Sequence, residues 1–212
     1  MTSETEPQPG VSILARALPA FSCCVVILGA AMSAWLIMGV MRAMRFAEAA
    51  GIGAVAGGMA EANLAIVISL YLAVFLMTVS MMVAVIRLFT PTKAASPSVI
   101  FFVIISALAI IPLTFVWQAN SLLMGGLMTR ANISVIAPNI QVCLVLTLVT
   151  AGLFTLILLA LSVAPLPGFM RARLKWTPVV MLVLMEILLI ALAIGFQIHM
   201  SWLRQVGIRE SF

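Results

Sequence analysis

Five long apolar segments constrain what this chain can fold into more than any other feature of its sequence. A transmembrane α-helix needs about 20 consecutive, predominantly apolar residues, and each of these segments reaches that length. Short connections that carry charged residues, glycine or proline separate them. The sequence therefore predicts an all-α integral membrane protein, a helical bundle of about five transmembrane helices. The expected spans cover about residues 18–41, 63–86, 98–122, 139–162 and 179–199.

The composition excludes a soluble globular fold. Of the 212 residues, 65% are hydrophobic and 8% are charged, and the mean hydropathy is +1.29, whereas ordinary soluble domains carry about 25% charged residues. The longest polar stretch stands at the N-terminus. We therefore expect a short polar tail over residues 1–17, a single transmembrane domain over residues 18–204 and a short tail over residues 205–212.

The charged residues indicate membrane topology rather than a surface for nucleic acid. Eleven Lys and Arg outnumber six acids, which gives a formal net charge of +5, but the cations stand at the ends of the apolar segments and form no single cluster. The most basic short loop holds Arg171, Arg173 and Lys175. Because short basic loops stay in the cytoplasm, this loop favours a cytoplasmic N-terminus. We expect the lipid bilayer as a partner and no nucleic acid.

Scarce residue types exclude most catalytic and metal sites. The chain has no Asp, one His and three Cys, whereas zinc sites need several Cys or His ligands and calcium sites need many oxygen ligands. The sequence contains no nucleophile–base set and no phosphate-binding loop. We therefore expect no enzymatic activity, no metal and no cofactor. The single His199 could ligate haem only across a dimer interface.

One acid lies deep inside an apolar segment. Glu186 stands near the middle of the fifth span, where an ionised carboxylate costs about 3 kcal/mol or more. It must be protonated, paired or turned toward protein. At 100° per residue, Gln197 and Arg204 fall within ~20° of Glu186 around a helix, whereas His199 lies ~140° away. Two alternatives stay open: Glu186 moves a proton, or it holds neighbouring helices together.

Other polar side chains recur at helical spacing inside the apolar segments. Thr114, Gln118 and Ser121 form an i, i+4, i+7 stripe on the third segment. Thr147 and Thr150 share a face on the fourth. Such residues either join helices through hydrogen bonds or line a path for ions. Both interpretations stay open for the stripe. The threonine pair is a candidate part of a proton path.

Small residues and prolines predict where helices pack and bend. Gly53, Gly57 and Gly58 precede the second span, and glycines of this kind allow helices to approach closely. Pro112 lies inside the third segment, where the missing N–H predicts a bend. Pro138 suits the first turn of the fourth helix.

The entry to the second span carries an acid among small residues. Residues 53–70 read GAVAGGMAEANLAIVISL, with Glu61 in the first turns of the expected helix, where the helix dipole favours a negative charge. The hairpin over residues 22–88 resembles the MotA/TolQ/ExbB proton-channel family. Its AEA triplet matches the acidic centre of the family motif APGIAEALLATAIGL, and Gly29 with Trp35 echoes the motif GLFGTVWGIM.

The same pattern can be traced a second time. Residues 132–147 can be aligned with the acidic motif, with Val142 in the place of the acid. Thr147 falls where the family has threonine, whereas the corresponding residue of the first copy is Ile66. This pattern suggests an internal duplication in which one copy keeps the acid and the other keeps the threonine.

The resemblance implies a proton-channel-like subunit of an ion-driven, energy-transducing complex in the bacterial inner (plasma) membrane. It further implies a homo-oligomeric ring, commonly a pentamer, around a single-span membrane partner that moves as protons flow. Glu61 would lie near the channel, with Glu186, Thr147 and Thr150 as further candidates for the proton path. The alternative is a small multi-span transporter, or a structural subunit of a membrane complex without channel activity.

Overall fold

Five long α-helices make up most of the protein in the computed structural model, which describes residues 13–46, 52–89, 96–128, 133–163, 168–172 and 174–209. The helices are α1 (Ile13–Phe46), α2 (Ile52–Phe89), α3 (Val99–Met128), α4 (Ile133–Val163) and α5 (Thr177–Arg209). The short elements are strand β1 (Ser96–Pro97), the 3₁₀ turn η1 (Gly168–Met170) and strand β2 (Arg171–Ala172).

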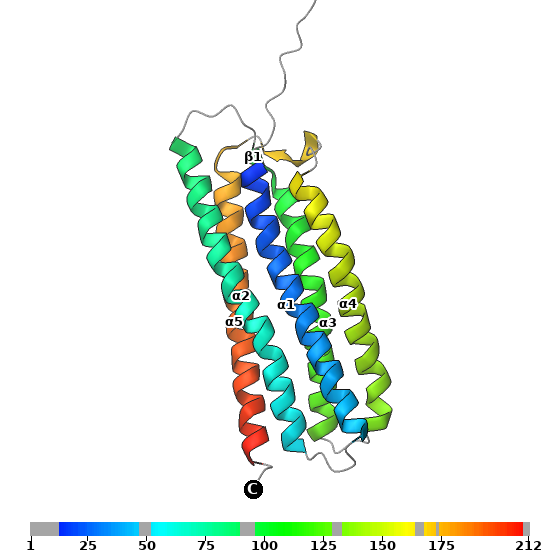
Figure 1. The fold of residues 1–212 in the computed structure, drawn as a ribbon. Coiled ribbons are helices and arrows are strands. Elements are labelled where there is room, and N and C mark those ends of the chain that lie inside the picture. The colour runs from blue at the N-terminus through cyan, green and yellow to red at the C-terminus, as the bar shows by residue number, and fades with distance from the viewer. Residues whose placement is uncertain are drawn as a thin grey trace, which may run out of the picture.

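All five helices run along the long axis of one elongated bundle (Figure 1). They contain 30 to 38 residues, which corresponds to lengths of about 45–57 Å, more than the ~30 Å of a bilayer's hydrocarbon core. Each contains a segment long and apolar enough to cross a membrane. The prediction of an all-α bundle of about five transmembrane helices is confirmed, and the chain is a multi-pass membrane protein.

Helix α1 lies against three other helices of the bundle. It packs against α2, α3 and α4, whereas α5 packs mainly against α2 (Figure 1). Because the helices alternate in direction, the first residues of α1, α3 and α5 share one end of the bundle, where β1 also lies. We call this end the N-side end. The last residues of α5 lie at the opposite end, which we call the C-side end.

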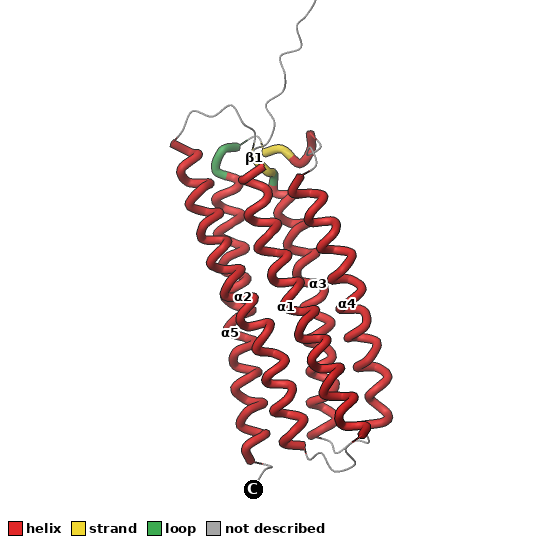
Figure 2. The backbone as a smooth tube through the Cα atoms, in the orientation of Figure 1, coloured by secondary structure: helices red, strands yellow, loops and turns green. Residues whose placement is uncertain are grey.

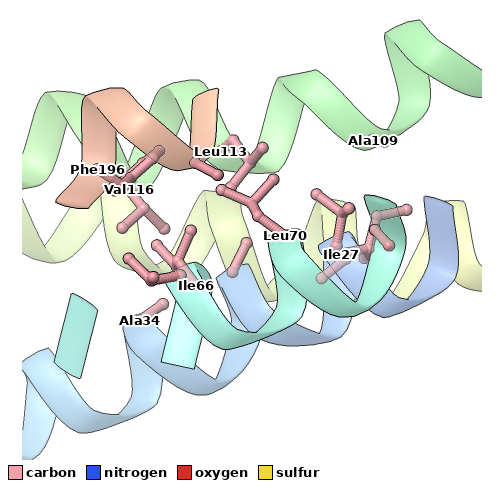
Figure 3. Close-up of a cluster of buried hydrophobic side chains, with 14 of the residues drawn as sticks. Ile27, Ala34, Ile66, Leu70, Ala109, Leu113, Val116 and Phe196 are labelled. Carbon is pink, nitrogen blue, oxygen red and sulfur yellow. The ribbon is translucent and has the colours of Figure 1, made fainter. Parts of the chain in front are cut away.

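The core consists mainly of aliphatic side chains from neighbouring helices. Ile27, Ile66, Leu70 and Val116 are fully buried and lie together where α1, α2 and α3 meet (Figure 3). The small side chain of Ala34 is buried beside them. Small residues at such positions let helix backbones approach closely. The core therefore combines close packing of helices with a few buried phenylalanine rings.

The outside of the bundle is as apolar as its core. Side chains that are more than half exposed include Leu28, Phe75, Val149, Leu156 and Ile187. Soluble monomers rarely expose large contiguous apolar patches. In a membrane, however, these side chains contact lipid chains of similar polarity. The outer surface is thus suited to a lipid bilayer.

Helices α1, α2 and α4 begin at least five residues before their expected spans, and α1 begins at Ile13, inside the expected polar tail. Helix α2 begins at Ile52 rather than near residue 63, because the Ala- and Gly-rich stretch before the span packs on α1 through Gly58 and Val40. Helix α4 begins at Ile133, so the placement of Pro138 in its first turn is wrong. Residues 133–137 of α4 are helical and precede Pro138. One of them, Ile136, contacts Gly126 of α3.

Pro112 lies inside α3, which is helical on both sides of it. A proline at such a position removes one backbone hydrogen bond. The helix nevertheless continues through Pro112 to Met128. The bend expected at Pro112 stays a prediction.

Two short strands join connections at the N-side end (Figure 2). Strands β1 and β2 pair antiparallel, with Ser96 opposite Ala172 and Pro97 opposite Arg171. The N–H of Ser98 also donates to the carbonyl oxygen of Met170 across 2.8 Å. This ladder ties the start of α3 to the chain just before α5. Strands of two residues are too short to give a periodic signal in a sequence.

Candidate functional site

Polar side chains join α2 and α5 at two levels within their spans. Oγ1 of Thr78 donates to Oε1 of Glu186 across 2.7 Å, and the hydroxyl of Tyr71 donates to Oε1 of Gln197 across 2.7 Å. We call these four residues the α2–α5 polar seam. Tyr71 and Thr78 stand two turns apart on one face of α2. The predicted common face of Glu186 and Gln197 is confirmed, because both side chains contact the same neighbouring helix.

The hydroxyl of Thr78 has one proton and two neighbouring acceptors. Its Oγ1 lies 2.7 Å from Oε1 of Glu186 and 3.0 Å from the carbonyl oxygen of Val74. When the hydroxyl proton points toward Val74, the short contact requires a proton on the carboxyl group of Glu186. When it points toward Glu186, the carboxylate accepts it. The geometry therefore accommodates the carboxyl group both with and without its proton.

Glu186 is half-buried and deep in the membrane span. It lies ~8 Å from the middle of the segment Thr177–Gln205 at 1.5 Å per residue, well inside the ~15 Å half-thickness of the hydrocarbon core. An acid at this depth is costly unless a protein group or water compensates it. Thr78 supplies such a group.

Glu61 occupies a different environment. Its side chain is exposed on α2, ~16 Å from the middle of the segment Val55–Phe89, which places it at the edge of the hydrocarbon core. Among the described residues, no hydrogen bond or ion pair joins Glu61 to Glu186 or to Thr147. Glu61 and Glu186, the two acids proposed for the proton path, therefore do not interact directly within the described part of one chain.

The threonine pair on α4 bonds within its own helix. Thr147 is fully buried and donates to the carbonyl oxygen of Cys143 across 2.9 Å. Thr150 donates to the carbonyl oxygen of Leu146 across 2.7 Å. Since α4 packs against α1 and α3, the pair does not contact Glu186. The structure does not bring the four proton-path candidates together within one chain.

The polar stripe of α3 lies on the outside of the bundle. Thr114, Gln118 and Ser121 are all exposed. The hydroxyls of Thr114 and Ser121 donate to the carbonyl oxygens of Ile111 and Trp117 on the same helix. Within the described part of the chain, the stripe therefore does not join helices. Gln118 presents its amide at the outer surface.

The predicted packing glycines differ in their surroundings. A Cβ on Gly58 would lie 2.8 Å from Cγ2 of Val40, so this residue does permit close contact with α1. A Cβ on Gly57 would meet no atom within 4 Å, so its predicted packing role is wrong. Gly53 is part of α2, but its surroundings lie outside the described side chains. Among the described glycines, the closest contact between α1 and α2 is instead at Gly29, which faces Ser69.

The sequence did not predict a buried pair of asparagine side chains that joins α2 and α3. Nδ2 of Asn120 on α3 donates to Oδ1 of Asn63 on α2 across 2.8 Å, and both side chains are fully buried. The signal was present, because an Asn inside an apolar span needs a hydrogen-bond partner. The sequence does not reveal that partner, since the two residues belong to different segments. Tyr71 and Thr78 were missed for the same reason.

The single histidine contacts α3 rather than α2. The rings of His199 and Trp117 have centroids 5.0 Å apart, and Trp117 also meets Phe196 edge to face at 5.2 Å. Glu186 and His199 therefore face different helices, as their expected angular separation predicts. Among the described residues, no three His, Cys, Asp or Glu side chains gather as a metal site would require.

Comparisons with known proteins do not identify a relative. No family model, curated protein or solved structure matches the chain. The resemblance of the first hairpin to the MotA/TolQ/ExbB family stays a hypothesis, and function has to be argued from the geometry of the protein itself.

Proposed function

We propose that this protein is a proton-translocating subunit of a membrane complex, and that Glu186 takes up and releases the proton. The observation that carries the proposal is the position of the Thr78 hydroxyl group. It lies within hydrogen-bond distance of both the Glu186 carboxyl group and the Val74 carbonyl oxygen. Acids within transmembrane helices commonly mark ion pathways and proton relays. Glu186 combines this depth with a partner that tolerates both of its protonation states.

A rotation of one hydroxyl group is sufficient to keep the hydrogen bond when Glu186 gains or loses its proton. With a proton on Glu186, the carboxyl group donates to Oγ1 of Thr78, whose own proton points toward Val74. When the carboxyl group loses its proton, the hydroxyl turns and donates to the carboxylate. The second hydrogen bond of the α2–α5 polar seam, between Tyr71 and Gln197, takes no part in this rearrangement.

The complex we propose is the one that the hairpin resemblance implies: a homo-oligomeric ring in the bacterial inner membrane around a single-span partner. The exposed stripe of Thr114, Gln118 and Ser121 supports an oligomer, because a second polypeptide gives membrane-embedded polar groups hydrogen-bond partners that lipid chains lack. In such a ring, Glu61 of one copy would lie near the channel.

Proton flux into liposomes tests the role of Glu186. The purified protein is reconstituted with a pH-sensitive dye inside the vesicles, and a potassium diffusion potential drives proton entry. We expect Glu186→Gln to lower the initial rate at least tenfold, since an amide has no ionised form near neutral pH and cannot alternate between a protonated and a deprotonated state. Tyr71→Phe is the matched control, because it removes the other hydrogen bond of the seam and leaves the acid in place. It should keep most of the rate.

Equal rates for Glu186→Gln and the unaltered protein would contradict the proposal. Loss of flux in Glu61→Gln alone would transfer the proton role to Glu61. The folded state of each variant is checked by circular dichroism and gel filtration before reconstitution, so that a lower proton flux cannot result from misfolded protein.

The detergent-corrected mass from light scattering tests the ring. We expect a fivefold multiple of the 22.6 kDa chain, the stoichiometry that the resemblance implies. A monomer or dimer would contradict the ring and favour the second candidate function, a structural subunit or small transporter.

A structural role has its own supporting observation. Hydrogen bonds from Thr78, Tyr71 and Asn120 each join two different helices, as packing contacts would. A purely structural Glu186 predicts that Glu186→Leu lowers the thermal unfolding midpoint in detergent. The proton role predicts a folded variant that lacks flux.

A further inference from the structure

A small cavity lies at the N-side end of the bundle. Its volume is about 60 Å³, and it is enclosed by the start of α1, the end of α2, strand β1 and the starts of α3 and α5. Arg87 of α2 and Lys175, which precedes α5, line it from two sides. Most of the remaining wall is apolar and includes Leu14, Leu18, Val83, Leu88 and Leu182.

The charged residues that the structure describes at this end of the bundle are basic. Arg16 on α1 is only 4% exposed, and its neighbours Ala15 and Leu18 line the cavity. In the part of the chain that the structure describes, the acids are Glu61, toward the C-side end, and Glu186, in the middle of α5. Helices α1, α3 and α5 begin beside the cavity and α2 ends beside it, so the positive ends of three helix dipoles outnumber one negative end there.

The cations lie at the depth of lipid headgroups. At 1.5 Å per residue, Arg16 is ~17 Å from the middle of the segment Ile13–Arg42, and Arg87 is ~22 Å from the middle of Val55–Phe89. The polar layer of a bilayer begins ~15 Å from its midplane and extends to ~22 Å. The cavity therefore faces the layer that contains the phosphate groups.

The size and lining of the cavity match a phosphate group on a hydrocarbon chain. A volume of 60 Å³ accommodates about four to six water-sized groups, and a phosphate group has five heavy atoms. Leu14 at its edge is 51% exposed, so the apolar wall continues onto the lipid-facing surface. A freely soluble anion would gain nothing from such a wall.

We propose that this cavity binds the phosphate group of an anionic phospholipid, held between Arg87 and Lys175, with the acyl chains along the apolar surface beside Leu14. Basic pockets between transmembrane helices recognise anionic headgroups in this way. The site is distinct from the α2–α5 polar seam, and binding there does not depend on proton movement.

Lipid binding by the full chain in detergent tests the site. Native mass spectrometry measures the affinity for phosphatidylglycerol, which is anionic, and for phosphatidylcholine, which is zwitterionic. Two interfacial cations predict a preference of about thirtyfold for phosphatidylglycerol. Lys175→Gln should reduce it to about fivefold, because one of the two cations remains. Arg87→Gln should have the same effect. Arg204→Gln, which removes an exposed cation at the C-side end, is the matched control and should leave the preference unchanged.

Several outcomes would overturn the proposal. One is equal affinity for the two lipids, and another is an equal loss of preference in Arg204→Gln and Lys175→Gln. Complete competition by millimolar inorganic phosphate would assign the site to a soluble anion. A preference that emerges only after deletion of residues 1–10 would identify the acidic tail, with Glu4 and Glu6, as the occupant. Lys175→Gln keeps the test valid should Arg87→Gln fail to fold, because Lys175 is exposed before α5 begins.

Discussion

A Gly29→Ala substitution is expected to lower the thermal unfolding midpoint of the protein in detergent by about 2–12 °C. The added Cβ would overlap both Oγ and Cβ of Ser69 on α2, and it would lie 3.2 Å from the carbonyl oxygen of Ala65. Because Cβ of Ser69 is itself in the way, no rotation of the serine side chain removes the overlap. The helices must separate, and such overpacking costs about 1–3 kcal/mol.

Gly39→Ala provides the matched control on the same helix. A Cβ on Gly39 would meet no atom within 4 Å, and alanine favours a helix over glycine by up to about 1 kcal/mol. We expect an unchanged or slightly raised midpoint. Equal destabilisation by both substitutions would show that the contact between α1 and α2 at Gly29 is not as close as the structure indicates.

Removing either member of the buried amide pair is expected to destabilise the bundle by about 1–3 kcal/mol. Asn63→Ala leaves the amide of Asn120 without its partner, and Asn120→Ala does the same to Asn63. Both residues are fully buried, so lipid headgroups and bulk water cannot replace the lost hydrogen bond. The free energy of unfolding in mixed micelles, measured by titration with a denaturing detergent, reports the loss.

The double substitution distinguishes a hydrogen-bonded pair from two independent residues. After Asn63→Ala, the second change removes an amide that is already unpaired, so the double variant should be less destabilised than the sum of the two single variants. Asn139→Ala, an exposed asparagine on α4, is the control and should have little effect. Additive losses at Asn63 and Asn120 would contradict a direct interaction.

Part of the candidate site could be predicted from residue spacing. The regular turn of a helix places Glu186 and Gln197 on one face and turns His199 away from it. In the structure, the first two contact α2 and the last contacts α3. The identity of Thr78 as the partner of Glu186 could not be predicted. Thr78 lies in another span, and nothing in the sequence distinguishes its hydroxyl group from those of the other Ser and Thr residues in the apolar segments.

The prediction for the packing glycines is correct for Gly58 and wrong for Gly57, and the reason is similar. Gly57 and Gly58 are adjacent in the sequence, yet only Gly58 faces α1, because adjacent residues point about 100° apart around a helix. The sequence indicates Gly29 only through its likeness to a family motif, and not as a packing residue, although among the described glycines it makes the closest contact between α1 and α2. Which side of a helix meets a neighbour is not encoded in local composition.

The sequence by itself determined the number of spans and the angular order of side chains around each helix. Both follow from local rules, since a backbone in lipid must satisfy its own hydrogen bonds and a span needs about 20 apolar residues. Only the tertiary structure decided which spans are neighbours. Lipid chains are as apolar as leucine, so helix faces toward lipid and toward protein have nearly the same composition. The α2–α5 polar seam, the amide pair and the cavity at the N-side end therefore emerge only once the helices are packed.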